Sequence, residues 1–456
     1  MAKKVDADYL VVGAGAMGLA FTDALVDHAD ARVLVVDRRD GVGGHWRGAY
    51  SFVRLHQPSP FYGVASTPMS DAVQGDGPEA GLCNRASRAE VLAYYDDVRA
   101  RLEGTGRVQV MTSTAYADRA VTGPDGRRLE LPAHCRVVDA RYLSPAIPAE
   151  VPPPFAVGDD VRVVPVNDVV GLDPDGPFVV VGSGKTATDA IVRLLTTGTA
   201  PDRVCWVRPR EPWMFNRAVV QPDPALFLGA SADLWENAVA ADSVDDLLLR
   251  VEEAGVLLRF DRSVVPTMAR VPILGEWELD LLRTVEHVVR RGHLRAVERG
   301  RLRFADGTDV RVADDAVVVH CAAHGLRTPP MVPQWGADQI TLQTVRTGFP
   351  CFGAALTGYV EATRTDDAEK NRLCPPNHYG DTPADWVEMN VIGTRNAAAF
   401  SAEPDVKAWA DGVALNPARI PPGAGSPALD RVLERIAEHA GPGTARAAEL
   451  VRLARG

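Results

Sequence analysis

Short apolar runs alternate with helix-like patterns at two places along this chain. At the first place, an apolar run at residues 9–12 is followed by apolar residues at helical spacing over 19–25 and by a second run at 32–36. At the second place, runs at 177–181 and 203–207 flank another helical pattern. Strand–helix–strand alternation of this kind is typical of parallel βαβ units. We therefore predict an α/β fold that contains two such units.

A glycine-rich turn joins the first run to its helix. It reads Gly13-x-Gly15-x-x-Gly18, and the next run ends in Asp37, 24 residues after Gly13. In such a turn, backbone N–H groups at a helix N-terminus bind a pyrophosphate, and the acidic residue accepts hydrogen bonds from the adenosine ribose. We predict an FAD-binding site with the following cofactor-binding residues: Gly13, Gly15, Ala16, Met17, Gly18, Asp37 and Arg38.

The stretch beyond this acidic residue contains a second glycine pair and then a polar loop. The sequence Gly43-Gly44-His45-Trp46 lets the backbone approach the flavin side of the cofactor, because glycine has no Cβ. A loop rich in proline and aromatic residues follows at 54–63. An ordinary surface turn is the alternative for the glycine pair. The two stretches supply these candidates: Gly44, His45, Trp46 and Arg54 for the cofactor, and His56 and Gln57 for catalysis.

The second glycine-rich turn reads Gly182-x-Gly184-x-x-Ala187. Alanine is an accepted third residue of the dinucleotide fingerprint. A P-loop would need a glycine five residues before Gly184, where this chain has Val179. We therefore predict a second dinucleotide site here, with these residues: Gly182, Gly184, Lys185 and Thr186. Lys185 either meets a phosphate or is solvated.

Two arginines follow the strand of the second unit. That strand ends in Arg208-Pro209-Arg210 rather than in an acidic residue. A guanidinium at this point suits the 2′-phosphate of NADP and offers little to a bare ribose. We predict that Arg208 and Arg210 select NADPH over NADH. The alternative is that both arginines are solvated at a strand end.

The motifs together resemble those of a known family, the flavoprotein monooxygenases with two dinucleotide-binding domains. This family includes flavin-containing, Baeyer–Villiger and N-hydroxylating enzymes. The resemblance rests on the first fingerprint, on Asp37 with Gly-Gly-x-Trp, and on the loop Arg-Leu-His-x-Pro-Ser-Pro-x-Tyr-Gly at 54–63. It continues through a helix expected to begin near Ala86-Ser87 and resumes at the second glycine turn. It implies an FAD domain, a smaller inserted NADPH domain, and an active site between them.

The expected domain organisation follows from this resemblance and from the positions of proline and glycine, which mark turns and linkers. We expect residues 1–150 to form the first part of the FAD-binding domain, with a hairpin near 123–126. Residues 155–325 would form the NAD(P)H-binding domain and end with a strand at 316–322. Its irregular insertion at 211–275 is either a lid or substrate wall, or a segment packed on the sheet. Residues 326–456 would complete the FAD-binding domain, with a helix near 352–361 and C-terminal helices over 428–454.

The resemblance also implies the chemistry. NADPH passes a hydride to FAD, and the reduced flavin activates O2 as a C4a-(hydro)peroxide that oxygenates a small molecule at nitrogen, sulfur or a ketone carbon. It places the loop of His56 and Gln57 near the flavin, and both side chains can donate a hydrogen bond to a ring or peroxide oxygen. We predict these two as catalytic residues. The alternative is that they cap backbone groups within their loop.

One family motif is absent, and its absence keeps other functions open. The connection between the two dinucleotide turns usually carries Phe-x-Gly-x-x-x-His. Here residues 155–168 contain no histidine and end in Asn167-Asp168. This departure favours, as an alternative, an NADPH-dependent flavin reductase or dehydrogenase that does not oxygenate. A nucleotide-binding partner without enzymatic activity is the third reading.

Bulk properties agree with an enzyme for small molecules. The 456 residues carry a formal net charge of −11, which argues against a nucleic-acid partner. No apolar stretch reaches the roughly 18 residues that span a bilayer, and Met1 to Asp6 lead directly into the first strand without a signal peptide. We therefore expect a cytoplasmic protein whose partners are a small-molecule substrate and O2, with no membrane partner. The substrate and the oligomeric state stay open.

The cysteines do not suggest redox or metal chemistry. All six are widely spaced, and none belongs to a Cys-x-x-Cys pair. The chain therefore lacks the dithiol of disulfide reductases that share the two-dinucleotide plan. Zinc-type spacings of cysteine and histidine are also absent from the sequence. We expect no metal site, and buried cysteines in the reduced state.

Overall fold

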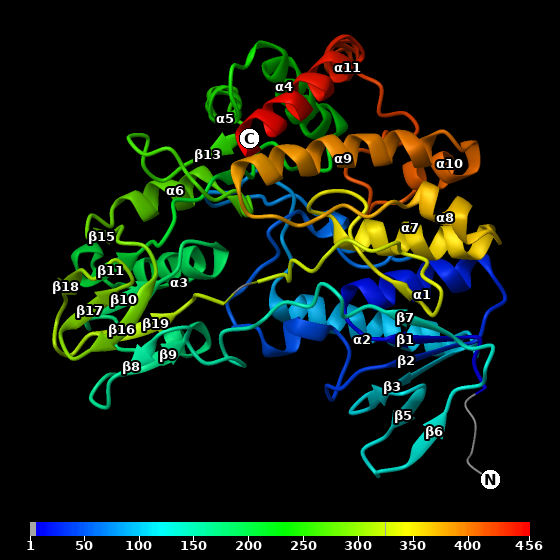
Figure 1. Cartoon of the computed structure of the whole chain (residues 1–456), viewed down its shortest axis with the longest axis horizontal. Helices are drawn as coiled ribbons and strands as arrows, with labels where there is room; N and C mark the ends of the chain where they lie inside the picture. The colour runs from blue at the N-terminus through cyan, green and yellow to red at the C-terminus, as the bar shows by residue number, and fades with distance from the viewer. Residues whose placement is uncertain (1–5, 324) are drawn as a thin grey trace.

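Two parallel five-stranded sheets form the two lobes of the molecule (Figure 1). The computed structural model describes residues 6–323 and 325–456. Residues 1–5, on which the expected lack of a signal peptide partly rests, lie outside the described residues. The first sheet has the order β20 (Gln339–Thr341), β7 (Arg136–Asp139), β1 (Tyr9–Val12), β2 (Val33–Val36) and β3 (Val108–Met111). The second has the order β15 (Val288–Val289), β11 (Val204–Val207), β10 (Phe178–Val181), β19 (Val317–His320) and β9 (Val163–Pro165).

Each sheet contains one of the predicted βαβ units. In the first, α1 (Ala16–His28) connects β1 to β2, and in the second, α3 (Lys185–Thr196) connects β10 to β11. The four strands of these units are almost entirely buried, which explains their unbroken apolar sequences. The predicted α/β class with two Rossmann-like units is confirmed.

The first sheet is assembled from both ends of the chain. After β19, the chain crosses back and adds β20 beside β7. The next helix, α7 (Pro350–Thr363), then packs along α1. This packing is close, because a Cβ at Gly358 would lie only 2.4 Å from the carbonyl oxygen of Phe21. The second sheet is therefore built from residues that lie between two parts of the first.

Three smaller sheets decorate the lobes. The predicted hairpin near 123–126 is confirmed. Its sheet contains β4 (Ala115–Ala117), β5 (Ala120–Thr122) and β6 (Arg128–Glu130). A second sheet beside the β10 lobe contains β8 (Ala156–Val157), β16 (Leu294–Glu298), β17 (Arg301–Phe304) and β18 (Asp309–Arg311). The third contains β12 (Met214–Asn216), β13 (Leu257–Leu258) and β14 (Ile273–Leu274), all within or at the border of the 211–275 segment.

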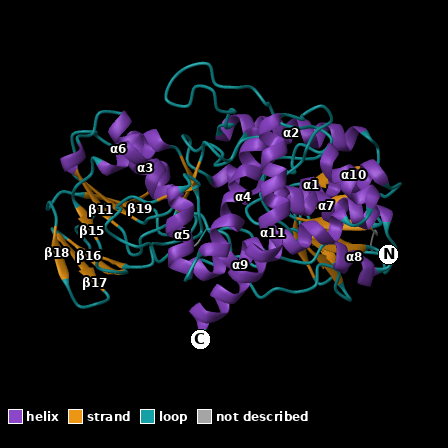
Figure 2. Cartoon of the chain, turned by 90° about the horizontal axis from the view of Figure 1, so that it is seen from above, coloured by secondary structure: helices purple, strands orange, loops and turns teal. Residues whose placement is uncertain are grey.

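A helical layer bridges the two lobes and lies between the sheets in the view from above (Figure 2). It combines α4 (Pro224–Ala240) and α5 (Val244–Glu253) of the 211–275 segment with α9 (Pro383–Ser401) and α11 (Pro427–Arg455). Gly443 permits close contact between α11 and α4, since a Cβ there would lie 2.3 Å from the carbonyl oxygen of Trp235. The segment thus packs chiefly on C-terminal helices. The pattern over 428–454 forms one continuous helix, although Pro442 lies inside it.

The remaining helices complete the two lobes and this layer. They are α2 (Arg88–Gly104), α6 (Glu276–Arg283), α8 (Asp367–Leu373) and α10 (Pro404–Gly412), with short 3-10 turns η1 (Gly44–Gly48), η2 (Ser59–Phe61), η3 (Val166–Gly171) and η4 (Pro201–Arg203). The helix expected near Ala86-Ser87 is confirmed. Ser87 caps α2 in a capping box with Glu90.

The structure also bears on the predictions about the cysteines and about membrane-spanning helices. All six cysteines are buried and unpaired. Among the described residues, no helix has both the length and the apolar character that crossing a membrane requires.

Candidate functional site

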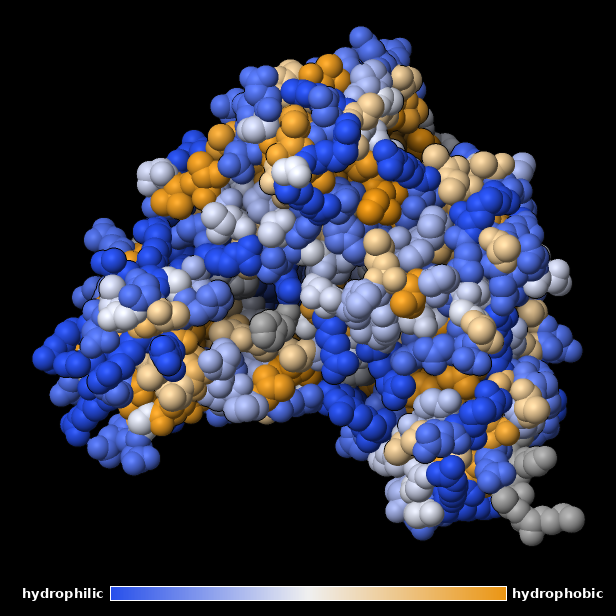
Figure 3. All heavy atoms as spheres, in the orientation of Figure 1, coloured by the Kyte–Doolittle hydropathy of each residue, from blue (hydrophilic) through white to orange (hydrophobic). Residues whose placement is uncertain are grey.

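A single large cavity connects both glycine-rich turns. It has a volume of about 1180 Å³, and residues of both sheets, the 211–275 segment and α9 line it. The space-filling surface is hollowed between the lobe that contains β10 and the lobe that contains β1 (Figure 3). Pockets for one small ligand occupy roughly 300–1,000 Å³. The cavity is therefore large enough for more than one ligand.

The first glycine turn presents bare backbone to this cavity. Gly15 is the N-cap of α1, and no side chain caps the helix, so its first N–H groups are available to an anion. Gly13 has φ = +115°, a conformation that favours glycine. Gly18 does not line the cavity, but a Cβ there would lie 1.9 Å from the carbonyl oxygen of Gly13. Gly18 thus permits close packing of helix on strand.

The acidic residue of the first unit is held in place by backbone N–H groups. The two carboxylate oxygens of Asp37 accept hydrogen bonds from the backbone nitrogens of Ala14 and Arg39, each at 2.8 Å. Each oxygen keeps a free lone pair for a further donor such as a ribose hydroxyl. Asp37 is buried at the cavity wall, whereas Arg38 is exposed at its edge.

The second glycine pair packs directly against the first turn. Gly44 has φ = +58°, and a Cβ there would lie 2.9 Å from the Cα of Gly15. Burial, and then the charge of Arg39, lowers the pKa of the cavity-lining His45 to about 4. The indole of Trp46 donates to the hydroxyl of Tyr62 at 2.6 Å. These contacts give the predicted stretch one rigid arrangement beside the turn.

Arg54 lines the cavity from an exposed position. Its guanidinium donates to the carbonyl oxygen of Arg85 at 3.0 Å. This contact anchors the start of the 54–63 loop, and the guanidinium has four further N–H donors.

The second glycine turn repeats the arrangement of the first. Gly184 is the N-cap of α3, which also lacks a side-chain cap, and Gly182 has φ = +136°. Thr186 lines the cavity at the start of the helix. Lys185 forms an ion pair with Asp189 one turn later, and burial lowers its pKa despite that partner. Of the two alternatives for Lys185, solvation is therefore wrong.

The two arginines of the second unit have different surroundings. Arg208 is buried on the rings of Trp206 and Phe260, with its Nε 3.3 Å from Glu211, and it does not line the cavity. The expectation that both arginines face a cofactor phosphate needs correction for Arg208, and so does the alternative of two solvated side chains. Arg210 lines the cavity and donates to Asp381 at 2.8 Å.

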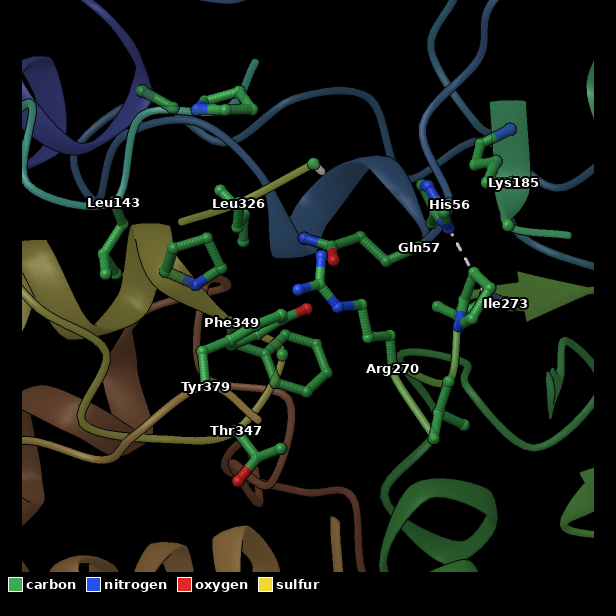
Figure 4. A pocket seen from close by; sticks show the side chains of 18 of the residues that line it. His56, Gln57, Leu143, Lys185, Arg270, Ile273, Leu326, Thr347, Phe349 and Tyr379 are labelled. Carbon is green, nitrogen blue, oxygen red and sulfur yellow. Dashed lines mark hydrogen bonds between the residues drawn. The ribbon is translucent and has the colours of Figure 1, made fainter. Parts of the chain in front are cut away.

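His56 and Gln57 both line the cavity (Figure 4). His56 Nδ1 accepts a hydrogen bond from the backbone nitrogen of Ile273 at 3.3 Å. Burial, together with the charges of Lys185 and Arg217, holds the pKa of His56 well below its usual range. The ring is therefore neutral and can donate through Nε2.

Gln57 is buried and donates to the carbonyl oxygen of Phe61 at 3.0 Å. This contact is the loop-capping role weighed as the alternative. Its side chain also points toward Arg270 and lies above Tyr379 and Phe349 in the close view (Figure 4), so it both caps its loop and faces the cavity.

Several lining residues could not be found from sequence motifs. Arg270 comes from the 211–275 segment and Tyr379 from the segment before α9. Neither lies near a fingerprint, and only the expectation that 211–275 forms a substrate wall pointed toward this side. Asn167, near the place where the family histidine is absent, donates to the carbonyl oxygen of Gly48 at 3.1 Å. It thus ties η3 of the second lobe to the end of η1 in the first.

A candidate metal cluster lies outside this cavity. His378, Asp385 and Glu388 could each offer one ligand atom to a common point. Arg455 already pairs with Asp385 at 2.8 Å and with Glu388 at 2.7 Å. Because an arginine neutralises the two carboxylates, we assign no metal to this cluster.

Comparisons with known proteins agree with this architecture. Residues 11–55 match the family model described as NAD(P)-binding Rossmann-like domain. The crystal structure of OTEMO in complex with FAD and NADP is similar, with a TM-score of 0.50 and 16% identity, over 97% of this chain and 99% of that one. At this identity the likeness shows the fold, which has two dinucleotide-binding units.

The curated relatives are much more similar in sequence. "Uncharacterized protein Rv2000" of Mycobacterium tuberculosis is 38% identical over 421 residues, which cover 91% of this chain and 78% of the relative. "Uncharacterized protein Mb2023" of Mycobacterium bovis matches with the same identity and coverage. The chain belongs to the family of these two mycobacterial proteins.

Proposed function

We propose that this protein is a flavin-dependent oxidoreductase that uses FAD and NADPH, of the monooxygenase type. The observation that carries the proposal is the pair of uncapped helix N-termini, on α1 and α3, that open onto one cavity. By contrast, Ser, Thr or Asp side chains cap α2, α4, α5, α8, α9 and α11. The helices α6, α7 and α10 also lack a side-chain cap, but α1 and α3 are the two that follow a glycine-rich turn at the end of a parallel strand. Their free first N–H groups fit two pyrophosphates.

The residues at the first turn fit FAD. The pyrophosphate would meet the N-terminus of α1, and the ribose would meet the free lone pairs of Asp37. The close approach of Gly44 to Gly15 leaves space for a cofactor where side chains would otherwise stand. His56 and Gln57 would then face the flavin side of the cavity.

The residues at the second turn fit NADPH. Its pyrophosphate would meet the N-terminus of α3, and Arg210, which pairs with Asp381, is the strand-end arginine that lines the cavity and would meet the 2′-phosphate. When bound, the two cofactors supply hydride transfer from NADPH to FAD, followed by reaction of the reduced flavin with O2. The chain itself would orient both ligands, exclude water from between them and donate hydrogen bonds from His56 Nε2. The substrate atom would be a nitrogen, a sulfur or a ketone carbon.

A second candidate is a flavin reductase or dehydrogenase that does not oxygenate. It is favoured by the absence of histidine from 155–168, where Asn167 instead binds the carbonyl oxygen of Gly48. This contact fixes the connection between the lobes but presents no ring to a nicotinamide ribose.

The experiment that tests the proposal begins with reconstitution of the purified protein with FAD. NADPH oxidation is then followed together with O2 consumption and release of H2O2. Consumption of O2 with transfer of one oxygen atom to an amine, sulfide or ketone supports a monooxygenase. Stoichiometric release of H2O2 for every compound tried favours the reductase. Protein that binds no FAD at any concentration would rule out both candidates.

A further inference from the structure

One partly buried arginine at the cavity has no side-chain partner among the described residues. Arg346 lies in the loop between β20 and α7 and lines the cavity. Within residues 6–323 and 325–456, its guanidinium makes no ion pair or hydrogen bond, and its buried Nε has no acceptor. Burial lowers the pKa of Arg346 to about 10, which still leaves it charged at neutral pH. A partly buried cation without a partner is costly to the fold.

Other cations along the same cavity differ in this respect. Four of them pair with carboxylates, as follows: Arg39 with Glu150, Arg141 with Asp139, Lys185 with Asp189, and Arg210 with Asp381. Arg38 has no such pair but is exposed to solvent. The charge of Arg346 is therefore neither neutralised by a residue that the structure describes nor freely hydrated.

The backbone on both sides of Arg346 is fixed by two buried asparagines. Asn396 of α9 donates to the carbonyl oxygen of Val345 at 2.9 Å. Asn377 donates to the hydroxyl of Thr347 at 2.9 Å, and that hydroxyl donates to the carbonyl oxygen of Met389 at 2.8 Å. Fixing the main chain on either side holds the side chain of Arg346 at the cavity wall.

The loop of Arg346 adjoins an apolar wall of the cavity. Thr347 and Phe349 both line it (Figure 4). The ring of Phe349 packs on that of Phe227 of α4, with 5.6 Å between centroids. The wall is formed by side chains of the 211–275 segment and of α9: Phe215, Phe227, Leu234, Trp235, Trp386 and Met389. A cation beside an apolar wall matches a ligand that has an anionic head and an apolar body.

We propose that Arg346 binds the anionic head of the substrate, and that the substrate class is small amphipathic acids with a carboxylate. This inference rests on the proposed function, since it names the substrate of the same cavity. The pyrophosphates already have the N-termini of α1 and α3, which lie at the carboxyl ends of β1 and β10. Arg346 instead follows the edge strand β20 and adjoins the apolar wall. The reduced flavin is the other source of negative charge, and the experiment separates it from the substrate.

The experiment measures ligand binding by calorimetry on the FAD-reconstituted protein. The probes are octanoate and the neutral octanamide, which share one apolar body. The variants are Arg346→Met, Arg346→Lys, and Arg395→Met as a matched control, because Arg395 is an exposed arginine of α9 outside the cavity wall. FAD affinity and the flavin midpoint potential are measured on each variant. Circular dichroism checks that each variant is folded.

The inference predicts that octanoate binds more tightly than octanamide to the unchanged protein. Arg346→Met should weaken octanoate binding by roughly 10- to 100-fold, the usual effect of losing a hydrogen bond to a charged group. Octanamide binding, FAD affinity and flavin potential should stay the same, Arg346→Lys should keep part of the preference, and Arg395→Met should change nothing.

Two results would overturn it. One is equal binding of octanoate and octanamide to the unchanged protein. The other is a shift of FAD affinity or flavin potential in Arg346→Met with octanoate binding unchanged, which would assign the arginine to the cofactor. Failure of the proposed function looks different, because the unchanged protein would then not take up FAD, and octanoate binding could still be measured on the FAD-free protein.

Discussion

Four buried charges connect the first lobe to the 211–275 segment and to α6 beyond it, and removing one of them tests how these segments are held together. Glu79 and Arg85 precede α2, Arg217 follows β12, and Glu278 lies in α6. Arg217 pairs with Glu79 and, at 2.8 Å, with Glu278, while Arg85 pairs with Glu79 at 2.7 Å. All four side chains are at most 8% exposed. We expect Arg217→Met to destabilise the protein strongly, because two carboxylates would then share Arg85.

The magnitude can be derived in two ways. Removing one partner from a buried ion pair costs about 3–5 kcal/mol. Independently, burial disfavours the charge of Glu79, but Arg217 and then Arg85 outweigh it and lower its pKa from 4.5 to about 2. That shift corresponds to about 3 kcal/mol of stabilisation. Because the folded pKa is depressed, this stabilisation is present above pH 4.5 and is lost as pH falls toward 2.

The assay compares urea midpoints of the first unfolding transition at pH 7 and at successively lower pH. Midpoints are used because a chain with several domains does not unfold in one step. Arg217→Met with Glu278→Gln is the matched control, since it leaves one arginine and one glutamate and should recover most of the loss. The acid sensitivity of the unchanged protein should exceed that of the control. A single variant within about 0.5 kcal/mol of the unchanged protein, the range of ordinary surface substitutions, would refute the reasoning.

Three further predictions concern the cofactor sites. Gly18→Val should abolish FAD uptake, since a Cβ there would lie 1.9 Å from a carbonyl oxygen of the same turn. The control Gly104→Val should keep FAD uptake, because a Cβ there would have no atom within 4 Å. Full FAD content in Gly18→Val would contradict this prediction. The rate of flavin reduction by NADPH should show no titration near the free histidine pKa of about 6.5, because His56 stays neutral; a step there, absent in His56→Asn, would contradict it. Arg210→Met should raise the KM for NADPH by roughly tenfold and leave that for NADH unchanged, whereas Arg208→Met should lower stability without altering this preference; the reverse pattern in kinetics would reassign the two arginines.

The βαβ units were predictable because their signals are local. A strand, a glycine turn and a helix lie within about thirty residues in such a unit, and the hydrogen bonds of Asp37 to Ala14 and Arg39 stay within one unit. The two arginines show where local reasoning stops. Strand alternation assigns faces only while the strand continues, and β11 ends at Val207. Beyond that point, Arg208 packs on the rings of Trp206 and Phe260. No sequence pattern indicates that Arg208 is buried in this way whereas Arg210 faces the cavity.

The substrate side of the cavity could not be predicted, and the reason lies in sequence separation. Its wall depends on contacts such as that of Arg435 in α11 with Asp233 in α4, which are 202 residues apart. The spacing of apolar residues within α4 does not indicate which helix will pack on it. The expectation that 211–275 is either a substrate wall or a segment packed on the sheet considered this segment alone. The observed wall also includes residues of the C-terminal helix α9.

The lack of a partner for Arg346 in the described part of the chain could not be predicted from the sequence either. In sequence, Arg346 is one of many scattered arginines, and its neighbours in the chain include no fingerprint. Its distinction is the lack of a carboxylate partner in the described structure, and that lack depends on every element that packs around the loop. A sequence motif can identify a group that binds a ligand, but only the folded structure shows which charged side chain has no partner. Under the proposed function, backbone N–H groups bind the cofactor pyrophosphates, and this remaining charge would then be free to select a substrate.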